Sequence, residues 1–192
     1  MRRTALLGLL ALVSWSAHAD LNVPGWRAGV AASFGNFRGS DVPDPELGNK
    51  FIDDNAVGAK VYGQYQFNDW FGIEAAYHNT GEFEDESTSL TLPGKLKLSF
   101  SGFSAQGLLY VPSPSDEVQF YVKAGFYDFD DELELSGSNI SSSSESGLVA
   151  GAGAVIEIAE RLGIRADVDW FDAKVGDMYS VNLGIQYRFG GE

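Results

Sequence analysis

Several residue types are scarce in this chain of 192 residues, and each scarcity removes a class of protein. There is no cysteine, which excludes a disulfide-stapled scaffold and a cysteine-based zinc module. Only 13 Lys and Arg stand against 27 Asp and Glu, and a formal charge of −14 is the opposite of the basic surface that nucleic acid requires. The sequence also lacks a P-loop and a dinucleotide-binding motif. We therefore expect no cofactor, no metal site and no nucleic-acid partner.

Glycine and aromatic residues are, in contrast, abundant. The chain contains 23 glycines, about 12% of its residues against a usual fraction of about 7%, and 13% of its residues are aromatic. With 44% hydrophobic residues it is too apolar for an intrinsically disordered chain. An ordinary globular core has no need for so much glycine, so the fold has to account for it.

The first 19 residues have the three parts of a secretory signal peptide. Arg2 and Arg3 give the positive start, residues 5–15 are apolar, and residues 17–19 read Ala-His-Ala, the small-x-small form of a cleavage site. No later run reaches the roughly 18 apolar residues of a transmembrane helix. We therefore expect export, cleavage after residue 19 and a single mature domain over residues 20–192.

Beyond the leader, hydrophobicity alternates with a period of two, the period of a β-strand. In the last such segment Val181, Leu183 and Ile185 alternate with Asn182 and Gly184. The alternating segments are residues 26–35, 57–67, 71–78, 103–111, 118–127, 148–158, 162–170 and 179–189. No position on their apolar faces is charged. The pattern predicts an all-β protein of eight strands.

Aromatic side chains gather at the ends of these segments. The predicted girdle consists of Trp26, Phe34, Tyr65, Phe67, Phe71, Tyr77, Phe126, Trp170, Tyr179, Tyr187 and Phe189. Two such belts are typical of a membrane barrel, in which amphipathic rings lie at headgroup depth on both sides. A soluble barrel or sandwich alternates as well, but it has no reason to carry the belts.

The connections between the segments alternate in length. The short ones are residues 68–69, 112–117 and 159–161. The long, acidic ones are residues 38–54, 81–97 and 128–146, with 173–178 a shorter loop on the same side. This asymmetry is that of outer-membrane barrels, which have short periplasmic turns and longer extracellular loops. Together with the belts it predicts an eight-stranded antiparallel up-and-down transmembrane β-barrel.

The chain resembles the small eight-stranded outer-membrane barrels, the OmpA-like transmembrane domain and its OmpX/Ail-type relatives. The resemblance rests on residues 65–74, 151–157, 165–169 and 187–189, and in pattern it covers the whole mature chain. It implies a monomer in the outer membrane of a Gram-negative bacterium, with both termini periplasmic and the long loops extracellular. It further implies insertion by the barrel assembly machinery and contact with outer-membrane lipid and lipopolysaccharide.

Strand parity places a set of charged residues inside the barrel. This predicted interior network consists of Arg27, Lys60, Glu74, Lys123, Glu157, Arg165, Asp167, Asp169 and Arg188. The interior of an eight-stranded barrel is just wide enough for side chains to fill, and buried charges have to pair. The pattern therefore favours a salt-bridged plug. A narrow porin-like channel along the same residues is the alternative, because ionisable groups within a membrane are functional candidates.

An enzyme that modifies the acyl chains of lipid A is a further alternative. Glu74, His78 and Thr80 share one strand face and include the residue types that nucleophilic catalysis needs. Parity places that face in the lumen, whereas a lipid substrate would approach from outside. Positions 74 and 78 also lie about 13 Å apart along a strand, too far for a direct hydrogen bond. We therefore predict that the chain is not an enzyme and has no catalytic residue.

Two of the long acidic segments are predicted to continue the strands beyond the membrane. Residues 90–98 have the pattern of a hairpin that turns at Pro93-Gly94, and residues 133–135 continue the strand of residues 118–127. A bulge or a lumen-facing stretch is expected near Gly102, because Phe100 shares the parity of the hairpin leucines.

The acidic segments are compatible with two kinds of partner. An extracellular protein would pair with an exposed strand edge or with the negative surface. Divalent cations shared with lipopolysaccharide would bind to an acidic rim. Residues 128–134 offer carboxylates to Ca²⁺ but lack the glycine and spacing of an EF-hand, so no metal site is assigned. The sequence predicts a structural or adhesin-like surface role.

Overall fold

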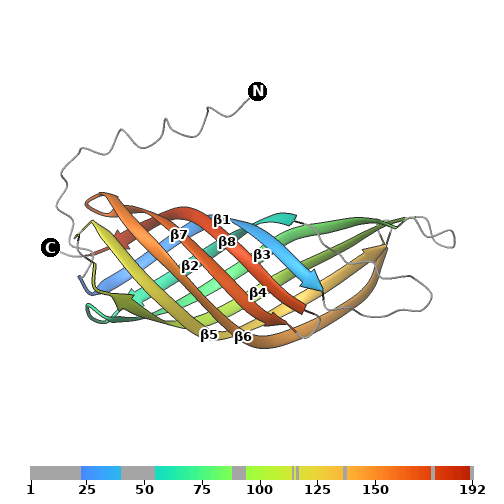
Figure 1. The fold of residues 1–192 in the computed structure, drawn as a ribbon, viewed down its shortest axis with the longest axis horizontal. Coiled ribbons are helices and arrows are strands. Elements are labelled where there is room, and N and C mark those ends of the chain that lie inside the picture. The colour runs from blue at the N-terminus through green and yellow to red at the C-terminus, as the bar shows by residue number, and fades with distance from the viewer. Residues whose placement is uncertain are drawn as a thin grey trace, which may run out of the picture.

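The computed structural model describes residues 23–39, 55–87, 94–113, 115, 117–135, 138–173 and 176–190, so the predicted signal peptide lies outside it. The described chain forms β1 (Gly25–Gly39), β2 (Asn55–Gln66), β3 (Phe71–Ser87), β4 (Gly94–Val111), β5 (Val118–Leu135), β6 (Ser138–Ala159), β7 (Leu162–Ala173) and β8 (Gly176–Phe189). Each strand pairs antiparallel with the next, and β1 pairs with β8 to close the barrel (Figure 1). The predicted eight-stranded antiparallel barrel is confirmed. No helix in the described ranges is long and apolar enough to cross a membrane.

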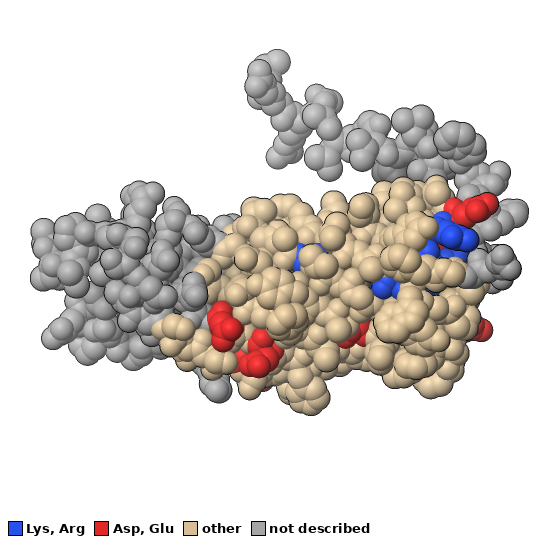
Figure 2. Space-filling model, turned by 180° about the vertical axis from the view of Figure 1, so that it is seen from behind, with Lys and Arg blue, Asp and Glu red and all other residues tan. Residues whose placement is uncertain are grey.

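The barrel has its apolar side chains outside and its polar ones inside. In β8, Val181, Leu183 and Ile185 are exposed, whereas Ser180 and Asn182 between them are buried. Successive side chains of a strand point to opposite faces, so the alternation of the sequence becomes an apolar outer wall and a polar lumen. Figure 2 shows one face of this wall, on which charged side chains gather mainly toward the two ends of the described part.

One end of the barrel carries the short turns, and we call it the turn end. Both described termini lie there, together with the connections at residues 67–70, 112–117 and 160–161. The first of these turns is fixed by Asn68, whose Oδ1 accepts hydrogen bonds from the backbone N–H groups of Trp70 (3.1 Å) and Phe71 (2.9 Å). Such a side-chain bond to the following backbone is what makes Asn a good turn residue.

Aromatic rings pack against one another at both rims. At the turn end the ring centroids of Trp26 and Tyr65 are 5.0 Å apart, and Tyr65 continues to Phe67 at 4.9 Å. At the opposite rim Tyr77 and Phe103 are 5.1 Å apart. All of these positions are on the outer wall, as expected for the two aromatic belts of a membrane barrel.

Four strands extend well beyond the second rim. The strands β3, β4, β5 and β6 have 17, 18, 18 and 22 residues, against 12 to 15 in the others. Eight to ten residues of each lie past the aromatic rim, which corresponds to a rise of about 20 Å for a tilted strand. We call this part, residues 79–87, 94–102, 128–135 and 138–147, the protruding sheet (Figure 1). The predicted continuation of β5 through residues 133–135 is confirmed.

The predicted hairpin at Pro93-Gly94 is wrong in register. Gly94 begins β4 and is paired with Ser87, so the strands of this hairpin are residues 82–87 and 94–99. The predicted first arm, residues 90–92, and Pro93 lie outside the described residues. The alternating leucines misled the prediction, because alternation shows which residues share a face but not which strand lies alongside: Leu96 pairs with Asp85, and Leu98 with Phe83.

The irregularity expected near Gly102 lies in the neighbouring strand instead. The register of β3 and β4 shifts between Asn79 and Glu82, where Gly81 has a left-handed φ of 77°. A Cβ at Gly81 would also overlap the backbone carbonyl of Val57. Gly102 itself keeps the regular pattern, and Phe100 is buried inside, as the lumen-facing alternative predicted.

Candidate functional site

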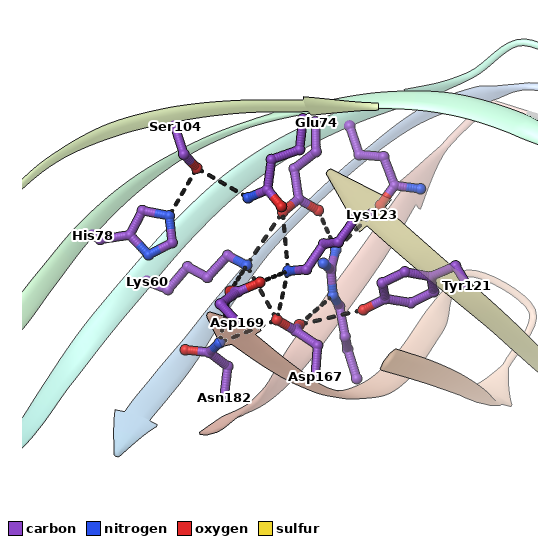
Figure 3. A network of polar contacts seen from close by, with 12 residues as sticks. Lys60, Glu74, His78, Ser104, Tyr121, Lys123, Asp167, Asp169 and Asn182 are labelled. Carbon is purple, nitrogen blue, oxygen red and sulfur yellow. Dashed lines mark hydrogen bonds and ion pairs between the residues drawn. The ribbon is translucent and has the colours of Figure 1, made fainter. Parts of the chain in front are cut away.

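Six charged side chains meet in the middle of the lumen, and we call them the ion cluster (Figure 3). All are buried, and they come from four strands: Lys60 in β2, Glu74 in β3, Lys123 in β5, and Arg165, Asp167 and Asp169 in β7. Three are basic and three are acidic. The cluster therefore has no net charge, which is the condition under which buried ions are tolerated.

Asp167 holds the largest number of partners in the ion cluster. Its Oδ1 lies 2.7 Å from Lys123 Nζ and 3.3 Å from Lys60 Nζ, and its Oδ2 lies 2.8 Å from Arg165 Nε. The side-chain amide of Asn182 donates a further hydrogen bond of 3.1 Å to Oδ1. One carboxylate thus joins β2, β5 and β8 to its own strand, β7.

The other two carboxylates complete the same cage. Glu74 Oε2 is 2.6 Å from Arg165 Nη1, and its Oε1 is 3.2 Å from Lys60 Nζ. Asp169 contacts Lys123 Nζ at 2.6 Å and Lys60 Nζ at 3.1 Å. Each lysine therefore has more than one carboxylate within ion-pair distance, and removing one carboxylate leaves several cations undercompensated.

Arg165 is held between two tyrosine rings, and those rings fit because glycine faces them. The guanidinium carbon is 4.2 Å from the ring centroid of Tyr62 and 4.9 Å from that of Tyr121, within the range of cation–π contacts. Tyr62 is paired with Gly29, and Tyr121 with Gly153. A Cβ at either glycine would overlap the tyrosine ring or its hydroxyl. These close approaches explain part of the high glycine content.

The remaining three residues of the predicted interior network lie nearer the turn end. Arg27 Nη1 donates a hydrogen bond to Gln66 Oε1. Arg188 Nη2 donates a 2.6 Å bond to the backbone carbonyl of Glu160 and lies 3.8 Å from Glu157 Oε2. The structure thus divides the nine charged residues into a tight group of six and a looser group of three.

Apolar side chains fill the lumen beyond the ion cluster, at the level where the protruding sheet begins. We call them the apolar cluster: Ala56, Phe100, Tyr127, Phe129, Val149, Phe171 and Met178. The ring centroids of Tyr127, Phe129 and Phe171 are 4.7 to 5.4 Å apart. Rings at these distances pack directly against one another, so the cluster crosses the lumen as a solid layer.

A serine and a histidine lie at hydrogen-bond distance below this layer. His78 Nε2 is 2.9 Å from Ser104 Oγ, and Ser104 also accepts a 3.1 Å bond from Gln106 Nε2. Such a pair resembles a nucleophile and its base. Both residues are buried on the inner face, and the His78 ring packs on Phe129 and Phe171 at 5.6 and 5.5 Å. The pair therefore faces the lumen and not the outer wall.

The protruding sheet is strongly acidic. Residues 79–87, 94–102, 128–135 and 138–147 contain ten Asp and Glu and two Lys. Asp128 and Asp130 in β5 are exposed, and Ser144 Oγ in β6 lies 3.5 Å from Asp128 Oδ1. No group of three or more His, Asp or Glu suited to a metal occurs among the described residues. The side chains of residues 131–134, in the segment considered for Ca²⁺, lie outside the described part.

A sequence model of the outer membrane protein beta-barrel domain matches residues 5–189. The chain belongs to this family. Among solved structures, Ail of Yersinia pestis is similar, with 17% identity, a TM-score of 0.61, and coverage of 86% of this chain and 99% of Ail. Neisserial surface protein A is similar as well, with 16% identity, a TM-score of 0.62, and coverage of 86% of this chain and 97% of its own. OprG of Pseudomonas aeruginosa has 14% identity and a TM-score of 0.59, with coverage of 88% of this chain and 99% of OprG. No curated protein matches the sequence.

Membership of this family shows on which side of the outer membrane each end of the barrel lies. The chain is a bacterial outer membrane protein, as predicted, and a small eight-stranded barrel similar to Ail and OprG. In such barrels the short turns face the periplasm and the long connections face the exterior. The protruding sheet accordingly stands outside the cell.

The alternation along each strand could have identified more lumen-facing residues than the prediction named. Phe129 continues the inward series of Tyr121, Lys123 and Tyr127, but the prediction did not assign a face to it because it lies in the acidic segment 128–146. The prediction left other inward residues out of the interior network, either because they are uncharged polar residues or because they are apolar. They are Gln64, Ser104, Leu108, Val149, Val155, Phe171, Met178 and Asn182. Their partners lie on other strands, so no local signal marks them.

Proposed function

We propose that this outer membrane barrel acts at the cell surface, where the protruding sheet binds an extracellular partner, and that its lumen does not conduct. The observation that carries the proposal is the contrast between the two parts of the molecule. Inside the membrane the ion cluster and the apolar cluster fill the lumen at successive levels. Outside it, four strands with paired backbones project about 20 Å, farther than a simple closure of the barrel requires.

Ail shares the fold of this chain at 17% identity. Ail is named an attachment invasion locus protein and was solved with a heparin analogue, sucrose octasulfate. The protruding sheet of this chain carries ten acidic residues and two lysines, so it would repel such a polyanion. The partner we propose is therefore a protein with a basic surface. Divalent cations that bridge the acidic residues to lipopolysaccharide are the simpler alternative.

Shortening the sheet tests the surface role. In this variant residues 82–99 and residues 130–144 are each replaced by a short turn, which leaves the ion cluster and the apolar cluster intact. Bacteria that produce the full chain are expected to bind immobilised extracellular proteins more strongly than bacteria that produce the shortened one. Equal amounts of both proteins in the outer membrane are the control. Unchanged binding by the shortened variant contradicts the proposed function.

Conductance tests the closed lumen. We expect purified protein in a planar bilayer to give no reproducible channel openings, because the charged groups are paired and the apolar cluster excludes water. The Phe129→Ala and Phe171→Ala double variant, which thins the apolar cluster, is the matched comparison. Well-resolved openings from the unmodified protein would favour the narrow porin-like channel instead.

A further inference from the structure

A glycine in β6 lets a lysine and an aspartate from the strands on either side of it meet. Gly151 is paired with Lys123 of β5 on one side and with Asp169 of β7 on the other. A Cβ at Gly151 would lie 2.7 Å from Asp169 Oδ1 and 2.9 Å from Lys123 Cε, so any side chain there would push the two apart. Because glycine has no side chain, the lysine and the aspartate come into contact over β6.

The groups that meet are an amine and a carboxyl group, and water is excluded from both. Lys123 Nζ lies 2.6 Å from Asp169 Oδ1, and both side chains are fully buried (Figure 3). This contact lacks the alignment of a hydrogen bond, and the ammonium donates instead to Asp167 Oδ1 at 2.7 Å. Groups that a fold holds in contact react as if each were present at a very high concentration.

Neighbouring side chains are placed to assist a reaction between them. Asp169 Oδ2 accepts hydrogen bonds from Lys60 Nζ at 3.1 Å and from the Asn182 side-chain amide at 3.0 Å. Two donors on one carboxyl oxygen stabilise the negative charge that develops there when a nucleophile adds to the carbon. Asp167 Oδ1, in contact with the Lys123 ammonium, can accept a proton from it. The ion cluster thus contains a nucleophile, a polarised carboxyl group and a base.

We propose that Lys123 and Asp169 condense to an amide bond after the barrel has closed. The bond forms between Lys123 Nζ and Asp169 Cγ, while the bond between Cγ and Oδ1 breaks. One ammonium proton stays on the amide nitrogen, and two end on Oδ1, which leaves as water; Asp167 carries one of these two. One positive and one negative charge disappear together, so the ion cluster stays neutral and no further reactant is needed.

Burial favours the amide over the ion pair. In water an amine and a carboxylate remain charged, because water solvates both ions. Inside the barrel Lys123 and Asp169 have no exposed surface, so the separate charges carry a desolvation cost that a neutral amide avoids. The product is a covalent link from β5 to β7 across the lumen. It forms only in the folded barrel, because the reacting groups and their helpers come from different strands.

Mass spectrometry of the full chain purified from outer membranes tests the proposal. We expect the intact mass to be lower, by one water molecule, than the mass calculated from the N-terminus found in the same digest. We also expect a branched peptide that joins the segments containing Lys123 and Asp169. Lys123→Arg keeps the charge but removes the amine, so its full mass should be recovered. Asp172→Asn, at an exposed position on the same strand, is the matched control and should keep the loss of one water.

Gel mobility gives a second readout that does not depend on stability. The link keeps the loop from residue 123 to residue 169 closed in the unfolded chain, so the boiled, unsubstituted protein should migrate ahead of boiled Lys123→Arg. Asp167→Asn should reduce the linked fraction, because it lacks the base. Full mass in the unsubstituted protein overturns the proposal. So does a loss of water without a branched peptide, or one that persists in Lys123→Arg, since an aspartate that cyclises elsewhere would produce the same mass.

Discussion

Replacing Asp167 by asparagine is expected to destabilise the folded barrel by about 3 to 5 kcal/mol, the usual cost of removing one partner from a buried ion pair. The carboxylate has Lys60, Lys123 and Arg165 within 3.3 Å, and all of them are buried. Asparagine preserves the shape but leaves three cations with two carboxylates. The loss therefore comes from uncompensated charge and not from a cavity.

Denaturant unfolding in lipid bilayers measures this loss, and the mobility of unheated against boiled samples on a gel shows whether the barrel still closes. Asp177→Asn, at an exposed position on β8, is the control and should change the free energy of unfolding by no more than about 0.5 kcal/mol. Adding Lys123→Gln to Asp167→Asn restores equal numbers of positive and negative charges and should recover part of the stability. A loss below about 1 kcal/mol for the single variant would show that the ion cluster is solvated.

Phe171→Ala is expected to cost about 3 to 5 kcal/mol through a different mechanism, the cavity left in a packed core. Phe171 is buried in the lumen, and its ring lies 5.1 Å from Phe129, 5.4 Å from Tyr127 and 5.5 Å from His78. Phe129 and Tyr127 are held by β5 and His78 by β3, and the paired backbones of these strands keep the rings from collapsing onto the space. The same unfolding measurement quantifies the loss.

Phe103→Ala is the matched control for that variant. Its ring is on the outer wall and is 67% exposed, so lipid replaces it when it is removed. We expect a markedly smaller loss of stability than for Phe171→Ala. Equal losses would mean that the apolar cluster contributes no more than the aromatic rim does, and the account of a solid layer across the lumen would be wrong.

The sequence was sufficient to predict the barrel because one physical rule governs every strand. With lipid outside and a narrow lumen inside, position along the strand alone decides which face a side chain occupies, as in Val181, Asn182 and Leu183. The same rule placed Lys60 and Asp167 on the inner face. It could not say that they meet, since they are 107 residues apart and their contact depends on the register of several strands.

The errors arose where that rule no longer applies. In the protruding sheet the alternating leucines of residues 90–98 could not specify the partner strand, and Gly94 pairs with Ser87 in β3. The bulge at Gly81 depends on a close approach to Val57 in the neighbouring strand, which no local pattern reports. Phe129 was not assigned to the lumen because it lies in the acidic segment 128–146, whose residues were considered as an extracellular connection.

The tyrosine–glycine contacts have a consequence for the width of the barrel. Tyr121 and Tyr127 both lie opposite a glycine in β6, and the two pairs occur in a single register. Sliding the strands by two residues would bring Tyr127 opposite Glu145 or Val149, where a side chain already occupies the space. For a fixed number of strands, stagger sets diameter. The tyrosine–glycine pairs therefore help to fix the register of β5 and β6, and with it the diameter of the barrel. Neutralising the charged residues would weaken the packing inside the lumen without changing that diameter.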